Sequence, residues 1–150
     1  MVLYKEEEFI TSNLSTDGIL AIDVNCQGIV ELTPHQLRFK QGFPNTFDKY
    51  MTRCINDELI PGETMWAEEG GYALCLLITC YRATGKDKDD ANTIDVYTEL
   101  ALENMFEQAR GEPIISGILN RAVDGRWQYI TGVIKELCIK YDSNWVVYNK

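Results

Sequence analysis

Polar side chains and glycines that could hold a small ligand lie at the end of, or after, three apolar stretches of this sequence, at 18–24, 72–79 and 114–119. Amide, hydroxyl and guanidinium groups recognise hydroxyl and phosphate oxygens, and glycine lets backbone N–H groups come close to a phosphate. A phosphorylated ligand can be held in this way without net positive charge. Our ligand-binding candidates are Asn25, Gly28, Thr33, Thr79, Asn120, Arg121 and Gly125.

Some of these positions also have a purely structural interpretation. Asn25 starts an Asn-Cys-Gln-Gly turn, where asparagine is favoured because it tolerates a left-handed conformation. Gly28 ends that turn and serves backbone geometry under either interpretation. Arg121 could offer a charged fork to phosphate, but an arginine in an exposed loop needs no ligand. Residue types alone therefore leave binding and structural roles open here.

The sequence lacks the known motifs of nucleophilic and metal-assisted catalysis. The sequence contains no G-x-S-x-G, no Walker loop and no G-x-G-x-x-G. It has five cysteines without a C-x-x-C pair, which predicts reduced, buried thiols. The single histidine, His35, has no cysteine at ligand spacing, so we expect no metal and no other cofactor. A Cys26–His35 nucleophile pair would need a proximity that the sequence does not establish.

Composition and charge limit the classes of partner. The 150 residues are 45% hydrophobic and 25% charged, which is ordinary for one soluble domain, and we predict a single domain over 1–150. The formal net charge of −9 argues against binding to duplex nucleic acid, which depends on many lysines and arginines. No stretch is apolar enough for a membrane span, and the acidic N-terminal segment lacks the features of a secretory signal, so we expect a cytoplasmic location.

The first half of the chain predicts a strand, two helices and a hairpin. The apolar run at 18–24 is typical of a buried strand. Thr33 and the following proline predict a helix start, and Gly-Phe-Pro at 42–44 interrupts that helix. Asn45 is then expected to cap a second helix with one apolar face. Strands at 63–67 and 72–79 surround a Glu-Glu-Gly-Gly turn, and the second should be central because it is continuously apolar.

The second half predicts alternating helices and strands. A charged surface loop at 82–90 precedes a helix at 92–110, a short strand at 114–119, a helix starting near Asp124 and a last strand at 144–148. This alternation predicts an α/β fold with a mainly parallel sheet and helices on both faces. Such sheets bind ligands at the carboxyl ends of their strands, which points to the loops after Val24, Thr79 and Leu119.

Several segments along nearly the whole chain resemble macrodomains, which are three-layer α/β/α modules built around an ADP-ribose pocket. The turn at 23–28, the Phe-Lys-Gln-Gly-Phe-Pro stretch at 39–44 with Tyr50 downstream, and the closing segments at 125–127 and 145–148 are similar to family motifs. The similarity is best to the branch that contains ADP-ribosyl-glutamate hydrolases and chromatin-remodeller macrodomains. It implies a mixed, mainly parallel central sheet between two layers of helices.

The departures from the family fall on both loops that would contact phosphate. A family Gly-x-Gly is replaced by the stretch at 29–34, where Glu31 would place a carboxylate near a pyrophosphate and Pro34 removes an N–H donor. The family's glycine-rich loop before the tryptophan helix reads Ile-Leu-Asn-Arg-Ala-Val-Asp-Gly at 118–125. The early Gly-Asp-x-Phe signature is only loosely matched by Glu-Glu-Glu-Phe at 6–9.

The resemblance implies roles for individual residues. Asn25 matches the family asparagine that contacts the distal ribose. Asp124 lies near the catalytic aspartate of the glutamate-specific hydrolases, although an aspartate that starts a helix is more often a cap. The resemblance offers Lys86 or Lys88 as the counterpart of the lysine that forms their covalent sugar intermediate, although solvated loop lysines are the simpler interpretation.

Three functions remain open. The first is noncatalytic binding of ADP-ribose or a related ADP-ribose-derived nucleotide, which would suit a phage or viral protein that sequesters a signalling nucleotide. The second is hydrolysis of ADP-ribose from modified proteins. The third is a protein-interaction module that has lost its ligand. The lost glycines and Glu31 favour the first or third, because catalysis needs tighter ligand placement than binding does. The sequence contains no indication of oligomeric state.

Overall fold

Strands and helices alternate through the chain much as the sequence predicts. The computed structural model describes residues 1–7, 9, 14, 16–28, 34–82, 86–119 and 126–148, with only the backbone described at 34 and 35. The elements in chain order are β1 (Val2–Lys5), β2 (Ile19–Asn25), α1 (Pro34–Gly42), α2 (Pro44–Ile55), β3 (Thr64–Glu69), β4 (Tyr72–Cys80), α3 (Ala91–Ala109), β5 (Ile114–Ser116), α4 (Arg126–Lys140) and β6 (Trp145–Tyr148).

The strands form one six-stranded sheet in the order β1-β6-β5-β2-β4-β3 within the described ranges. Every neighbouring pair is parallel except β3 and β4, which form an antiparallel hairpin. The predicted mixed, mainly parallel sheet is therefore confirmed. β4 lies between β2 and β3 and is buried along most of its length, as its continuous apolar sequence predicts.

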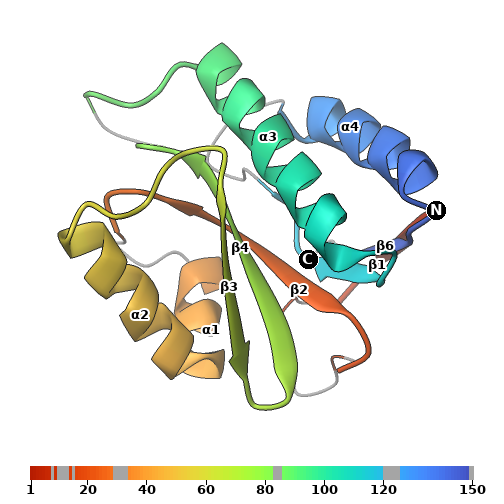
Figure 1. Cartoon of the computed structure of the whole chain (residues 1–150), viewed down its shortest axis with the longest axis horizontal. Helices are drawn as coiled ribbons and strands as arrows, with labels where there is room; N and C mark the ends of the chain where they lie inside the picture. The colour runs from red at the N-terminus through yellow and green to blue at the C-terminus, as the bar shows by residue number, and fades with distance from the viewer. Residues whose placement is uncertain are drawn as a thin grey trace.

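Two helical layers cover the sheet, which gives the predicted α/β/α arrangement (Figure 1). Side chains that alternate along β2 and β4 point to opposite faces because the side-chain period of a strand is two. Leu20, Ile22, Leu74 and Leu76 join the core beneath α1 and α2, where Phe39, Phe47 and Tyr50 are packed. Ile19, Ala21, Cys75 and Leu77 join the core beneath α3 and α4.

The break between α1 and α2 falls where Gly-Phe-Pro predicts it, but the cap of α2 differs from the prediction. Asn45 lies inside α2 rather than before it, and Phe43 occupies the N-cap position without a side-chain hydrogen bond. The carboxylate of Glu69, at the end of β3, accepts hydrogen bonds from the N–H groups of Asn45 (3.2 Å) and Thr46 (2.8 Å). A long-range acceptor thus replaces the local cap, because α2 packs beside the β3–β4 hairpin.

The remaining predicted elements appear with shifted ends. α3 starts at Ala91 with Asp90 as its cap, whose carboxylate accepts from the N–H of Thr93 at 2.8 Å. β5 ends at Ser116, three residues earlier than predicted. The sequence analysis missed β1, a short and mostly exposed edge strand beside β6. Within the described ranges, no helix has the length and apolar character that a bilayer crossing requires.

Candidate functional site

The loops expected to bind a ligand leave the sheet at one edge. β2 and β4 are parallel neighbours whose carboxyl ends pair at Asn25 and Cys80, whereas β5, on the other side of β2, ends at Ser116 opposite Ala21, four residues before the end of β2. The chain runs from β2 to the helices on one face, but from β5 and β4 to the helices on the other face. Such a point, where neighbouring connections go to opposite faces, is where open α/β sheets form their ligand crevice.

Asn25 is held in a defined orientation at this edge. The register with β4 shifts between Val24 and Asn25, which ends regular pairing. Oδ1 of Asn25 then accepts a hydrogen bond from the N–H of Gln27 at 3.1 Å, which forms an Asx turn. The hydroxyl of Tyr50, on α2, lies 2.9 Å from the carbonyl oxygen of Asn25 and 3.0 Å from its Oδ1. The side chain of Asn25 is therefore held both by the turn and by α2, a helix of the layer that covers one face of the sheet.

Tyr50 is suited to this role because it is fully buried and neutral. Its ring packs against Phe39 and Phe47, with centroid separations of 6.4 and 6.3 Å. Burial raises the pKa of Tyr50 well above its ordinary value, and the neighbouring Cys54 thiol adds to this effect. The hydroxyl therefore remains a hydrogen-bond donor at any physiological pH.

Gly28 closes the turn in a conformation that favours glycine. Its φ of +85° lies in the left-handed region, and a Cβ at this position would lie 3.1 Å from Cε of Met51 and 3.7 Å from Cβ of Cys54. The backbone of the turn therefore approaches α2 closely. This geometry agrees with the expectation that Gly28 serves the path of the backbone.

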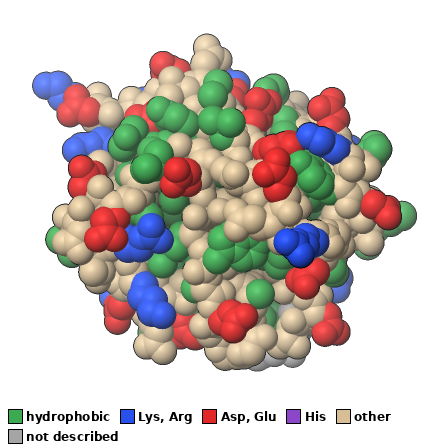
Figure 2. All heavy atoms as spheres, in the orientation of Figure 1, with side chains coloured by type: hydrophobic (Ala, Val, Ile, Leu, Met, Phe, Trp, Pro, Cys, Tyr) green, Lys and Arg blue, Asp and Glu red, His purple; other side chains and the backbone are tan. Residues whose placement is uncertain are grey.

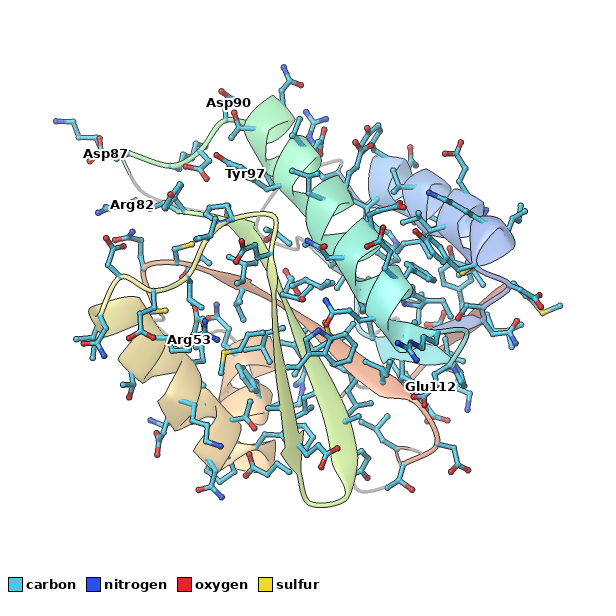
Figure 3. All side chains as sticks on the ribbon, viewed as in Figure 1. Arg53, Arg82, Asp87, Asp90, Tyr97 and Glu112 are labelled. Atoms are coloured by element: carbon cyan, nitrogen blue, oxygen red, sulfur yellow. The ribbon has the colours of Figure 1, made fainter. Side chains whose placement is uncertain are left out.

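The loop after β4 borders the Asn25 turn. The N–H of Cys26 donates to the carbonyl of Tyr81 at 3.2 Å, and Nη2 of Arg82 donates to Oε1 of Gln27 at 3.4 Å. Asp89 connects the two ends of the loop, because its carboxylate accepts from the N–H of Tyr81 at 2.7 Å. Figure 3 shows Arg82 and Asp87 extending outward from this end of the molecule, while Tyr97 lies along α3 nearby.

Thr79 lies inside the sheet in this structure. It is 3% exposed, and its Oγ1 is 3.5 Å from the carbonyl of Val24. Its hydroxyl therefore supports the carboxyl end of β2, and contact with a ligand would require a rearrangement.

An ion pair joins the starts of α3 and α4 near the same edge. Nη1 of Arg126 lies 3.1 Å from Oδ2 of Asp95, and the side chains are 31% and 11% exposed. Burial raises the pKa of Asp95, and the opposing effect of Arg126 does not cancel it. A positive charge at a helix N-terminus opposes the helix dipole, so Asp95 compensates for an otherwise unfavourable position of Arg126. The pair connects the two helices that follow the β4 and β5 loops.

The cysteines are free, as the sequence predicts. Burial raises the pKa of Cys26 and of Cys80 to about 12, so both remain thiols at neutral pH. A neutral, buried thiol is a poor nucleophile, which argues against a reactive Cys26. Among the described residues no group of three or more histidine, cysteine, aspartate or glutamate side chains could hold a metal ion.

Several predicted site residues lie outside the described residues, and two lie exposed in the loop after β4. The candidates outside the described ranges are Thr33, Asn120, Arg121, Asp124 and Gly125, and the side chain of His35 is likewise not described. Lys86 and Lys88 are exposed in the loop before α3. The structure thus brings Asn25, Gly28 and Thr79 together at the carboxyl edge.

A separate hollow lies at the opposite edge of the sheet. It has a volume of about 640 Å³ and is lined by residues around the amino ends of β2, β4 and β5, among them Asp17, Glu68 and Glu112. Figure 3 labels Glu112 at this end, far from Arg82. We favour the carboxyl edge as the ligand site, because the connections to α1, α3 and α4 leave the sheet there toward opposite faces.

The sequence analysis missed two contributors to the site. Tyr50 is named there only as part of the family motif, and the fold shows that its hydroxyl reaches Asn25, 25 residues away. The Arg126–Asp95 pair, whose members belong to two different helices, is not among the predictions. A buried tyrosine usually finds a partner for its hydroxyl, and this was the available signal.

Comparison with solved structures identifies the fold. The macrodomain of Mycobacterium tuberculosis DarG matches with a TM-score of 0.79 and 17% identity over 100% of this chain and 98% of that chain. The macrodomain of Thermus aquaticus DarG matches with a TM-score of 0.76 and 17% identity over 100% and 99%. Thermosipho africanus DarTG, solved in complex with ADP-ribose, matches with a TM-score of 0.69 and 16% identity over 97% of this chain and 43% of that chain.

These matches show that the chain has the macrodomain fold, as its motifs suggest. Comparison with protein-family models and with curated protein sequences finds no match.

Proposed function

We propose that this protein binds ADP-ribose or a related ADP-ribose-derived nucleotide at the carboxyl edge of its sheet. The observation that carries the proposal is the ordered Asn25–Gly28 turn, which follows β2 at the point where neighbouring connections diverge to opposite faces. The macrodomain fold and the ADP-ribose held by the similar Thermosipho africanus DarTG support the same ligand class. The ligand would extend from this turn toward the segment at 120–125, whose Asn120, Arg121 and Gly125 remain predicted contacts.

The local electrostatics are compatible with an anionic ligand despite the net charge of −9. Arg82 lies beside the turn, whereas Arg126, at the N-terminus of α4, is already paired with Asp95. Figure 2 shows acidic and basic side chains interspersed over the face in view, without a continuous basic patch. A few local donors therefore support a small phosphorylated ligand better than a long nucleic acid.

We further propose that binding is noncatalytic and that the protein sequesters its nucleotide. Cys26 and Cys80 are neutral thiols, and the hydroxyl of Thr79 is engaged within the sheet, so these side chains are not activated for attack. The residue for which the family resemblance implies catalysis is Asp124. A release assay on ADP-ribosylated protein should show no turnover, and turnover that disappears in Asp124→Ala would replace this proposal by hydrolysis.

The binding proposal is tested by calorimetric titration with ADP-ribose, its cyclic derivatives and related dinucleotides. We expect saturable one-to-one binding of at least one of them. Absence of heat and of any shift in unfolding temperature with every compound would overturn the proposal, because a ligand specific for the native state must stabilise it.

A further inference from the structure

The hydrogen bonds around Asn25 determine which end of its carboxamide remains for a ligand. The side-chain atom nearest the N–H of Gln27, at 3.1 Å, must be an acceptor because a backbone N–H can only donate. That atom is therefore Oδ1, and the same oxygen lies 3.0 Å from the hydroxyl of Tyr50. The reversed amide would place two donors against each other at the Gln27 contact, so the orientation is set by chemistry.

The remaining arm of the carboxamide carries only donors. Oδ1 accepts from the N–H of Gln27 and shares the single O–H of Tyr50 with the backbone carbonyl of Asn25, at 3.0 and 2.9 Å, and among the described residues Nδ2 of Asn25 donates no hydrogen bond. Tyr50 is 0% exposed and its ring is packed between aromatic neighbours, so its hydroxyl cannot swing away from this contact without disturbing the core. The carboxamide thus has a fixed polarity, with its N–H groups on the arm that remains for a ligand.

We propose that Tyr50 is a positioning residue that locks the carboxamide of Asn25 with its N–H groups toward the ligand, so that the site selects an oxygen acceptor there. This inference rests on the proposed function and adds the polarity of the contact. A ribose hydroxyl or another neutral oxygen satisfies it, whereas an ammonium or amide N–H at the same place does not. The selection arises from a residue that itself never touches the ligand.

The test compares Tyr50→Phe with Tyr72→Phe, a matched loss of one hydroxyl. The hydroxyl of Tyr72 donates to the carbonyl of Leu14 at 3.0 Å and belongs to the opposite edge of the sheet. Both variants keep the ring, and each should lose one hydrogen bond of similar kind. We expect Tyr50→Phe to bind ADP-ribose about tenfold more weakly than the parent, and Tyr72→Phe to bind like the parent.

A double-mutant cycle separates positioning from a general structural effect. In an Asn25→Ala background, Tyr50→Phe should cause a much smaller further loss of affinity, because the carboxamide that it positions is gone and only its contact with the backbone carbonyl of residue 25 remains. A Tyr50→Phe loss that persists unchanged without the Asn25 side chain would overturn the inference. An Asn25→Asp variant, which keeps acceptors for Tyr50 and Gln27 but has no N–H donors, should also bind at least tenfold more weakly; unchanged affinity would equally overturn it.

The side-chain amide of Asn25 supplies a readout without ligand. Its NMR resonances should shift and broaden in Tyr50→Phe but not in Tyr72→Phe, because only the first variant removes the hydroxyl beside Oδ1 and leaves Gln27 as its one donor. Identical Asn25 amide signals in the parent and Tyr50→Phe proteins would overturn the inference even if the nucleotide binds. Conversely, a parent protein with the expected amide signals and no affinity for any nucleotide would refute the proposed function while supporting the role of Tyr50.

Discussion

Replacing Glu69 by alanine removes the acceptor for the N-terminus of α2. Pro44 has no N–H, and the N–H of Phe47 donates to Phe43 at 2.9 Å, so the free donors of the first turn belong to Asn45 and Thr46. Both donate to Glu69, and Oγ1 of Thr46 does so as well, at 2.8 Å. This single carboxylate therefore satisfies the start of the helix that carries Tyr50.

The expected cost follows from these contacts. Loss of a helix cap costs about 1 kcal/mol, and loss of a negative charge near a helix N-terminus adds about 0.5 kcal/mol. Thr46 is only 2% exposed, so its hydroxyl would also lose its partner in a dry environment. We expect Glu69→Ala to lower the free energy of unfolding by about 2 kcal/mol and the unfolding temperature by about 4–8 °C. Glu69→Gln keeps an acceptor but loses the charge, so its cost should be about 0.5–1 kcal/mol.

The charge of Glu69 also predicts a pH dependence. Burial by itself raises the pKa of this carboxyl, but the hydrogen bonds from Thr46 and Asn45 and the nearby Lys49 outweigh it, so the pKa lies below the ordinary 4.5. A carboxyl whose pKa is lower in the folded than in the unfolded protein contributes stability above its ordinary pKa. That contribution is lost as the pH falls through the lowered value. The difference between parent and Glu69→Gln should therefore be full at neutral pH and disappear in stronger acid.

Urea unfolding followed by tryptophan fluorescence measures these differences, with an unchanged m-value as the condition for comparing variants. Glu68→Ala is the matched control because Glu68 is exposed on the same strand, and it should change stability by less than about 0.5 kcal/mol. A Glu69→Ala variant as stable as the control would refute this account of how α2 begins.

Three further predictions concern the carboxyl edge and the thiols. Gly28→Ala should cost about 1–2 kcal/mol of stability, because alanine is strained at φ +85°, and thermal unfolding will measure it. Arg126→Met should destabilise the protein by about 2 kcal/mol, because it leaves a largely buried carboxyl without its cation. It should also raise the pKa of Asp95 further. A carboxyl NMR titration that shows an unchanged pKa of Asp95 would contradict the pairing. Cys26 and Cys80 should resist a thiol reagent at pH 8 until the protein is unfolded, and mass spectrometry of labelled peptides will measure this. Rapid labelling of either thiol in the native protein would contradict their burial and raised pKa.

Strands and helices with strong local signals were predictable from the sequence. The continuous apolar run of β4 and the Gly-Phe-Pro break between α1 and α2 are determined by nearby residues, and both appear where expected. β1 could not be found in this way, because a short, exposed edge strand shows no burial pattern and gains its order by pairing with β6 from the far end of the chain.

The site was predictable only in its local part. The turn from Asn25 to Gly28 follows from residue types that favour it. The contacts that orient this turn do not follow from nearby residues. The hydroxyl of Tyr50 contacts Asn25 from 25 residues away, and the carboxylate of Glu69 accepts from Thr46, 23 residues away, at the start of the helix that carries Tyr50. The prediction that Asn45 caps α2 was wrong for the same reason. The carboxylate of Glu69, from the neighbouring hairpin, accepts from the first N–H groups of the helix in place of a local cap.

A crystal structure after soaking with ADP-ribose tests the central claim most directly. We expect nucleotide density beside the Asn25 turn, with a ligand oxygen within hydrogen-bonding distance of Nδ2 of Asn25. No density beside this turn at saturating nucleotide, or nucleotide bound instead in the hollow beside Glu112 at the opposite edge, would contradict the proposed site.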